Sequence, residues 1–228
     1  MTMKIIDSKK IDLDERITFI RVEPGDLIEM IETIINELSN LSWIAKFDQE
    51  YIRTSFDKRA SDTAKYLAEN IKLNKCDQVT GDTGEYIVSE VARKIIVTHL
   101  GYLDIPLAEL FKEQLIGNPG FDYYSANKEE IIIFGEAKYI SDRNAYGRGM
   151  EQVSRFIEEK QDISDLNDID KFFQPTSLSK ACKGEKAYSV AFSSKQTCTD
   201  KIIEGIKKNK YYGALVKHKE LIFVAVNV

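Results

Sequence analysis

The sequence predicts an α/β fold in which helices flank a small mixed β-sheet, behind a mostly helical N-terminal layer. Its 228 residues are 43% hydrophobic, which is enough to build a core. From residue 81 onward the apolar pattern alternates between helical and strand-like periods, in the order helix, hairpin, helix, strand, helix, strand. The last of these strands, 221–226, is almost wholly apolar and is therefore expected to be buried on both faces.

The first 80 residues form the predicted N-terminal layer. A strand is expected at 17–22, an amphipathic helix from Asp26 to about Leu38, and a second helix over 57–71. None of these segments carries a recognisable chemical motif. We interpret 1–80 as a docking region and 81–228 as the functional core.

The functional core opens on a helix that Asp82 can cap and whose apolar residues, from Ile87 to Ile96, recur at helical spacing. A hairpin follows, with strands at 121–125 and 131–140. A helix is expected over 146–160, a polar surface loop over 162–170, a strand at 188–193 and a helix at 199–208.

Three polar residues occur where the hairpin should be apolar. Period-two alternation puts Glu136 and Lys138 on the same face of one strand, and Asp122 lies on the other strand. Buried charges of this kind are costly unless they are paired or bind something. Two converging carboxylates indicate a divalent cation, and oxygen ligands favour Mg²⁺, with Mn²⁺ as the alternative. Lys138 could orient or deprotonate an attacking water, or neutralise a phosphate.

This pattern resembles the PD-(D/E)XK nuclease superfamily, with Gly120-Phe121-Asp122 as its first part and Glu136-Ala137-Lys138 as its second. The resemblance covers about residues 81–193. It implies a restriction-endonuclease-like core and Mg²⁺-dependent hydrolysis of DNA. It also implies metal ligation by Asp122, Glu136, the Ala137 carbonyl and Glu85, and an auxiliary role for Gln152 on the helix after the hairpin. A Gly-Phe pair replaces the family's proline before the aspartate.

Residue Glu85 also has a purely structural interpretation, because Asp82 and Glu85 have the spacing of a capping box. Gln152 could likewise be a solvated helix residue. The lone Glu-x-Lys tripeptide is common, so the nuclease interpretation depends on the order of the elements around it.

Within the superfamily, the segment around GEAKY is similar to the nuclease subunits of Hachiman-type antiphage systems. That resemblance implies a separately encoded helicase or ATPase partner, since the chain has no P-loop. A stand-alone type II restriction enzyme, which could be a homodimer, is one alternative. A non-catalytic DNA-binding or scaffolding subunit is another.

Charge and cysteine content bear on partners and compartment. Net charge is −5, but residues 1–125 hold 15 Lys+Arg against 22 Asp+Glu, whereas Lys171 to Lys219 holds 11 lysines against three carboxylates. That late stretch could contact DNA phosphates, although a solvated lysine face is the simpler explanation. Three scattered cysteines, expected to be buried, favour a reducing compartment. We expect a cytoplasmic protein without a membrane span.

Overall fold

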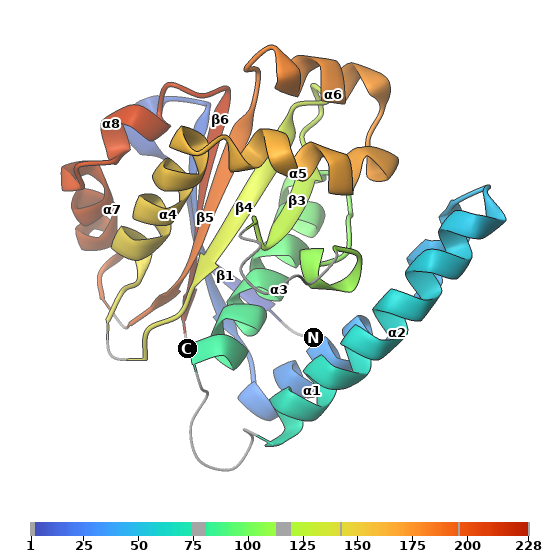
Figure 1. The fold of residues 1–228 in the computed structure, drawn as a ribbon. Helices are drawn as coiled ribbons and strands as arrows, with labels where there is room; N and C mark the ends of the chain where they lie inside the picture. The colour runs from blue at the N-terminus through green and yellow to red at the C-terminus, as the bar shows by residue number, and fades with distance from the viewer. Residues whose placement is uncertain (1–2, 74–80, 113–119, 142, 196, 228) are drawn as a thin grey trace.

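The fold is built on one mixed β-sheet (Figure 1). The computed structural model describes residues 3–73, 81–112, 120–141, 143–195 and 197–227. Within these ranges six strands pair in the order β1-β2-β6-β5-β4-β3. Their bounds are β1 Met3–Lys10, β2 Ile17–Pro24, β3 Tyr123–Ala126, β4 Ile132–Lys138, β5 Ala187–Ser194 and β6 Glu220–Asn227.

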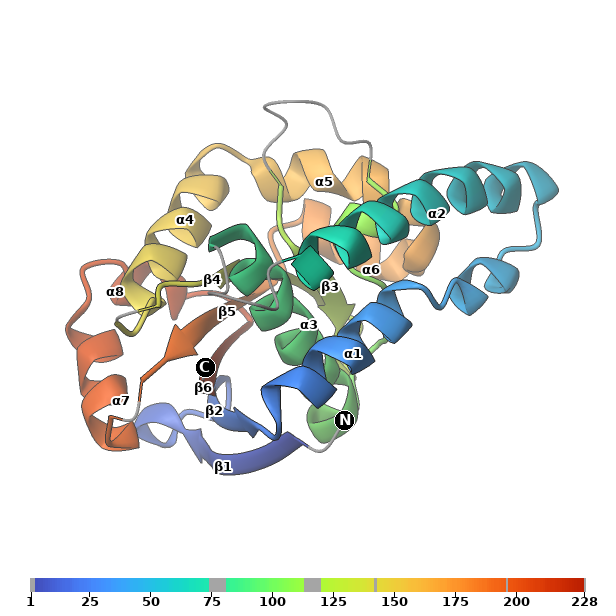
Figure 2. The same cartoon turned by 90° about the horizontal axis from the view of Figure 1, so that it is seen from below.

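Helices cover both faces of this sheet. The α-helices are α1 Leu27–Leu38, α2 Glu50–Leu73, α3 Gly81–Leu100, α4 Tyr146–Glu158, α5 Gln161–Ile169, α6 Pro175–Cys182, α7 Thr199–Lys208 and α8 Tyr212–Leu215. Short 3-10 turns lie at η1 Ile11–Leu13, η2 Ser42–Lys46, η3 Ala108–Leu110 and η4 Asp170–Phe172. Figure 2 shows α1 and α3 on one side of the strands and α4, α7 and α8 on the other.

The centre of the sheet is parallel and its edges are antiparallel. β2, β6, β5 and β4 run parallel to one another, while β1 and β3 pair antiparallel at the two edges. All eight residues of β5 are buried, and so are the first seven of β6, because helices pack on both faces. The predicted α/β class with a mixed sheet flanked by helices is confirmed, as is the doubly buried strand at 221–226.

The N-terminal segment contributes to this same sheet. β2 pairs in parallel register with β6, from Ile17 opposite Leu221 to Val22 opposite Val226, and β1 adds the edge strand. The boundary placed at residue 80 therefore divides segments that share one sheet. The edge strand β1 escaped the sequence prediction because its side chains alternate between half-buried and exposed, without a fully buried face.

The expectation of a surface loop at 162–170 is wrong, because this segment is helix α5. Its inward-facing positions are Asp162, Asp165 and Ile169, so the buried side of the helix carries aspartates in place of apolar residues. A hydrophobic pattern could not reveal it. The helix expected at 57–71 is also longer, beginning at Glu50.

Two further expectations concern single residues and membranes. Cys182 and Cys198 are free and exposed, which corrects the expectation that they are buried; Cys76 lies outside the described residues. No helix in the described part of the chain is both long and apolar enough to cross a membrane.

Candidate functional site

The candidate site begins at Asp122, the residue directly before β3. Its backbone extends the hairpin: Asp122 N–H donates to Gly135 O (2.9 Å), and Ala108 N–H donates to Asp122 O (3.0 Å). Its carboxylate Oδ2 accepts a hydrogen bond from Ala137 N–H at 2.7 Å. Asp122 is thus fixed across the hairpin from the Glu136-Ala137-Lys138 segment.

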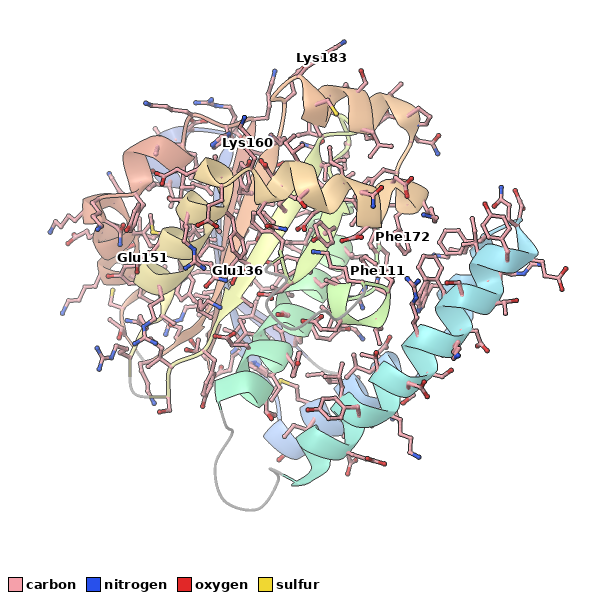
Figure 3. The ribbon with its side chains drawn as sticks, in the orientation of Figure 1. Phe111, Glu136, Glu151, Lys160, Phe172 and Lys183 are labelled. Atoms are coloured by element: carbon pink, nitrogen blue, oxygen red, sulfur yellow. The ribbon has the colours of Figure 1, made fainter. Side chains whose placement is uncertain are left out.

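The side chain of Glu136 is the most deeply buried acid of the site. It points from β4 with 1% of its side chain exposed, in the middle of the sheet region (Figure 3). Neither of its carboxylate oxygens has a hydrogen-bond partner among the described residues. Oε1 lies 2.9 Å from Lys138 Nζ, but this contact is an ion pair without hydrogen-bond direction. A buried carboxylate without hydrogen bonds is costly and calls for a functional explanation.

Lys138 lies at the end of β4, between two carboxylates. Its Nζ is 2.9 Å from Glu136 Oε1 and donates to Glu85 Oε2 at 3.1 Å. The same-face placement of Glu136 and Lys138 expected from strand periodicity is consistent with this ion pair. Lys138 and Glu85 also connect β4 to helix α3.

Burial and mutual repulsion shift the pKa of these groups. Burial first raises the pKa of Asp122 to about 6, against the opposing effect of Lys138. Burial, followed by the charge of Asp122, raises the pKa of Glu136 well above its usual range. Burial alone would lower the pKa of Lys138, but the charges of Glu136, Asp122 and Glu85 raise it above its ordinary value. Lys138 therefore carries its proton in this arrangement.

The auxiliary residue Glu85 belongs to the first turns of α3, which pass close to the end of β4. At the neighbouring Gly84, an added Cβ would lie 2.2 Å from the ring of Tyr139, so only glycine permits this approach. Glu85 is 35% exposed and reaches Lys138, as described above. Its predicted metal ligation stays a prediction.

Residue Gln152 is half-buried on α4, and no hydrogen bond of its side chain to another described residue is found. Gly149, three residues earlier and thus on the same helix face, lies beside β4 and β5: a Cβ there would be 3.9 Å from Lys138 Cγ. Gln152 therefore lies about one helical turn along α4 from Gly149, the residue that approaches the aliphatic part of Lys138. Its auxiliary role stays a prediction.

One acidic residue near the site was missed from the sequence. Glu109 lies in η3, next to the Ala108 amide that bonds Asp122 O, and its Oε2 is buried without a partner among the described residues. Burial, and then the charge of Asp122, raise its pKa to about 8. A single glutamate in this stretch carries no distinguishing signal in the sequence.

A second missed residue, Asp165 of α5, supports the backbone that leads into Asp122. Its carboxylate accepts hydrogen bonds from Phe121 N–H (3.0 Å), Tyr124 Oη–H (2.6 Å) and Gln161 Nε2–H (2.9 Å). It also pairs with Lys112 at 2.9 Å. Asp165 is only 1% exposed, so α5 anchors the start of β3 from inside the core.

The donor set can be compared with the needs of a divalent cation. Oxygen ligands suit Mg²⁺ and Mn²⁺. In the structure Glu136 Oε1 is 2.9 Å from the Lys138 ammonium, and Oε2 has no partner among the described residues. No cluster of three or more His, Cys, Asp or Glu side chains close enough to hold a metal ion occurs in the described ranges. A cation bound here would have Asp122 and Glu136 as its protein ligands, with water or substrate completing its coordination.

The lysines expected to contact phosphates are mostly engaged within the protein. Lys186 pairs with Asp162, Lys207 with Asp12, Lys208 with Glu204, and Lys219 with Glu185. The last three of these pairs are exposed and can exchange with other anions, whereas the Lys186–Asp162 pair is largely buried. The predicted phosphate contact by this stretch stays a prediction.

A scan against protein-family models and a search of curated proteins gave no match to this chain.

Proposed function

We propose that this protein is a Mg²⁺-dependent nuclease that hydrolyses DNA phosphodiester bonds, and that its α/β core is of the restriction-endonuclease-like type. The observation that carries this proposal is Glu136. It is a fully buried acid whose Oε2 has no partner among the described residues, with Lys138 Nζ 2.9 Å from its Oε1 and a second acid, Asp122, on the same hairpin. A purely structural acid buried this deeply would be expected to have donors to both oxygens.

The chain supplies three elements of such chemistry. Asp122 and Glu136 would hold Mg²⁺, which when bound supplies Lewis acidity toward a phosphate oxygen and activation of a water. Water adds to phosphorus, a P–O bond of the backbone breaks, and the products are a phosphate monoester and a hydroxyl. Lys138, which keeps its proton beside Glu136 and Glu85, is assigned to neutralise negative charge on the phosphate.

Glu85 and Gln152 are proposed as auxiliary residues beside this centre. Glu85 holds Lys138 in place through the 3.1 Å contact, and it could become a ligand if Lys138 turns toward substrate. Gln152 lies on α4 three residues after Gly149, which approaches the Lys138 side chain. Neither residue is required for the two-carboxylate site itself.

The proposed biological setting is a nuclease subunit that works with a separately encoded helicase or ATPase in antiphage defence. The acidic balance of residues 1–125 supports this, because the net negative charge of this part of the chain suits a protein partner. A type II restriction enzyme is the stand-alone alternative. Discrete fragments, rather than general degradation, would favour that alternative.

A plasmid-cleavage assay tests the proposed function. We expect cleavage with Mg²⁺, none with EDTA, and none by the Glu136→Ala or Lys138→Ala variants. Lys128→Ala, at an exposed lysine in the turn between β3 and β4, is the matched control and should cleave normally. Wild-type cleavage that persists in EDTA would exclude the metal mechanism. No cleavage under any condition, with or without the partner, would favour a non-catalytic subunit.

A further inference from the structure

A pocket of about 290 Å³ lies between α2 and the segment formed by α5 and η4. Its floor is apolar and made by the buried side chains of Ile52, Phe56 and Phe111. Tyr51, 72% exposed, stands at its edge. The volume is at the lower end of small-molecule pockets, so it suits one planar ring system better than a larger ligand.

The rim of this pocket is polar and mostly exposed. Asn167 and Asp168 contribute it from α5, Lys171 from η4, and Ser55 and Arg59 from α2. Lys171 makes only an exposed ion pair with Asp170 at 3.1 Å, which a phosphate can replace. An apolar ring floor with amide, carboxylate and cationic groups above it matches the face, the edge and the phosphate of a nucleotide.

The pocket is connected to the candidate site through η3 and its C-cap. Phe111 forms part of the floor, and the adjacent Lys112 pairs with Asp165, the residue that anchors Phe121 and so the entry to Asp122. The rings of Phe111 and Tyr124 are 6.2 Å apart. Figure 3 shows Phe111 and Phe172 on the side of the core that faces α2.

We propose that this pocket binds a single unstacked base of the nucleic-acid substrate, with the adjoining phosphate at Lys171. This inference rests on the proposed nuclease function and adds to it a preference for single-stranded or unwound DNA. In duplex DNA the bases are stacked and paired, so a base must leave the helix to enter a pocket. The pocket also gives α2 a role in substrate binding.

Stacking of the base on Tyr51 at the edge and on the aromatic floor supplies the affinity of the pocket for the base. Base stacking on an aromatic side chain is worth about 1–3 kcal/mol per base, which corresponds to roughly a 5- to 150-fold change in Kd. The side-chain amide of Asn167 can accept a hydrogen bond from a base amino group through its oxygen.

Binding of a short single-stranded oligodeoxynucleotide with one central 2-aminopurine tests the proposal, in EDTA so that no cleavage occurs. Stacking should quench the fluorescence of 2-aminopurine on binding to wild type. Ser55→Trp, which fills the pocket from an exposed position, should abolish the quench, and Tyr51→Ala should weaken binding about 5-fold or more. Tyr66→Ala changes an exposed tyrosine of the same helix outside the pocket and should bind like wild type.

The outcomes separate the pocket from the nuclease. Equal quenching by wild type and Ser55→Trp, or no quench by a wild-type protein that cleaves plasmid with Mg²⁺, would overturn the pocket and leave the nuclease function intact. Quenching that Ser55→Trp abolishes, without cleavage by wild type, would support the pocket and count against catalysis. A wild-type protein that neither binds the oligonucleotide nor cleaves DNA would overturn both.

Discussion

Two sets of buried acids in this molecule differ in how they are satisfied. Asp162 and Asp165 of α5 are each 1% exposed and each accepts several donors: Asp162 from Tyr188, Lys186 and the Ile163 amide, Asp165 from Phe121, Tyr124 and Gln161. Glu136 is equally buried and accepts no directed hydrogen bond from a described residue. Acids of the first kind hold the fold together, whereas an acid of the second kind costs stability, and we propose that cation binding is the reason for its presence.

The largest expected effect on stability is at Asp165, one of the two hydrogen-bonded acids of α5. Asp165→Ala removes the acceptor of three hydrogen bonds and leaves the half-buried Lys112 without this partner, so we expect a loss of about 3–5 kcal/mol in the free energy of unfolding. Urea denaturation measures it. Asp165→Asn, which keeps an acceptor oxygen, is the control and should lose less. A loss below about 1 kcal/mol for the alanine variant would show that Asp165 does not anchor β3.

The lysine of the site should affect activity more than stability. Lys138→Ala removes the charge assigned to the phosphate, and loss of one such group typically lowers the rate about 100- to 1000-fold. Single-turnover plasmid cleavage with Mg²⁺ measures the effect, and a normal far-UV circular dichroism spectrum checks the fold. Lys138→Arg, which restores the charge, should recover part of the rate. Equal rates for Lys138→Ala and wild type would remove Lys138 from the mechanism.

A smaller effect, with a defined pH dependence, is expected at Glu109. Its pKa is about 8 in the folded protein and near 4.5 when unfolded, so the folded state retains a proton that the unfolded chain loses across this window. Stability should therefore fall as pH rises from about 4.5 to 8. Glu109→Gln cannot ionise and should flatten that decline.

Thermal unfolding in EDTA at pH 5 and pH 8 tests this prediction. The Tm of Glu109→Gln minus the Tm of wild type should be larger at pH 8 than at pH 5. Each kcal/mol gained by the variant corresponds to about 2–4 °C in Tm. The same difference from wild type at both pH values would mean that Glu109 is not the titrating group.

The contrast between the two sets of acids also shows what the sequence could predict. The strand 131–140 was recognised from its apolar run, and period-two alternation was enough to bring Glu136 and Lys138 together, as their ion pair shows. The α/β class followed from the alternation of helical and strand-like segments. These features depend on local patterns, which a sequence displays directly.

The sequence could not reveal features that depend on what a side chain faces. α5 was mistaken for a loop because its buried side carries Asp162 and Asp165, whose donors include Phe121 and Tyr188, more than 20 residues away. Glu109 was passed over because its importance comes from the nearby Asp122, which tertiary structure alone brings close. Likewise, the edge strand β1 owes its conformation to pairing with β2.

The most direct test of the account asks whether Glu136 is a cation ligand, by measuring the change in Tm that Mg²⁺ produces. A ligand at 100 times its Kd stabilises by about 2.7 kcal/mol, so Mg²⁺ should raise the Tm of wild type by roughly 5–10 °C over EDTA. Glu136→Gln keeps the size of the side chain and should show no such rise, while in EDTA it should unfold at a higher temperature than wild type. An equal Mg²⁺-dependent rise in both proteins, or none in wild type, would contradict the account.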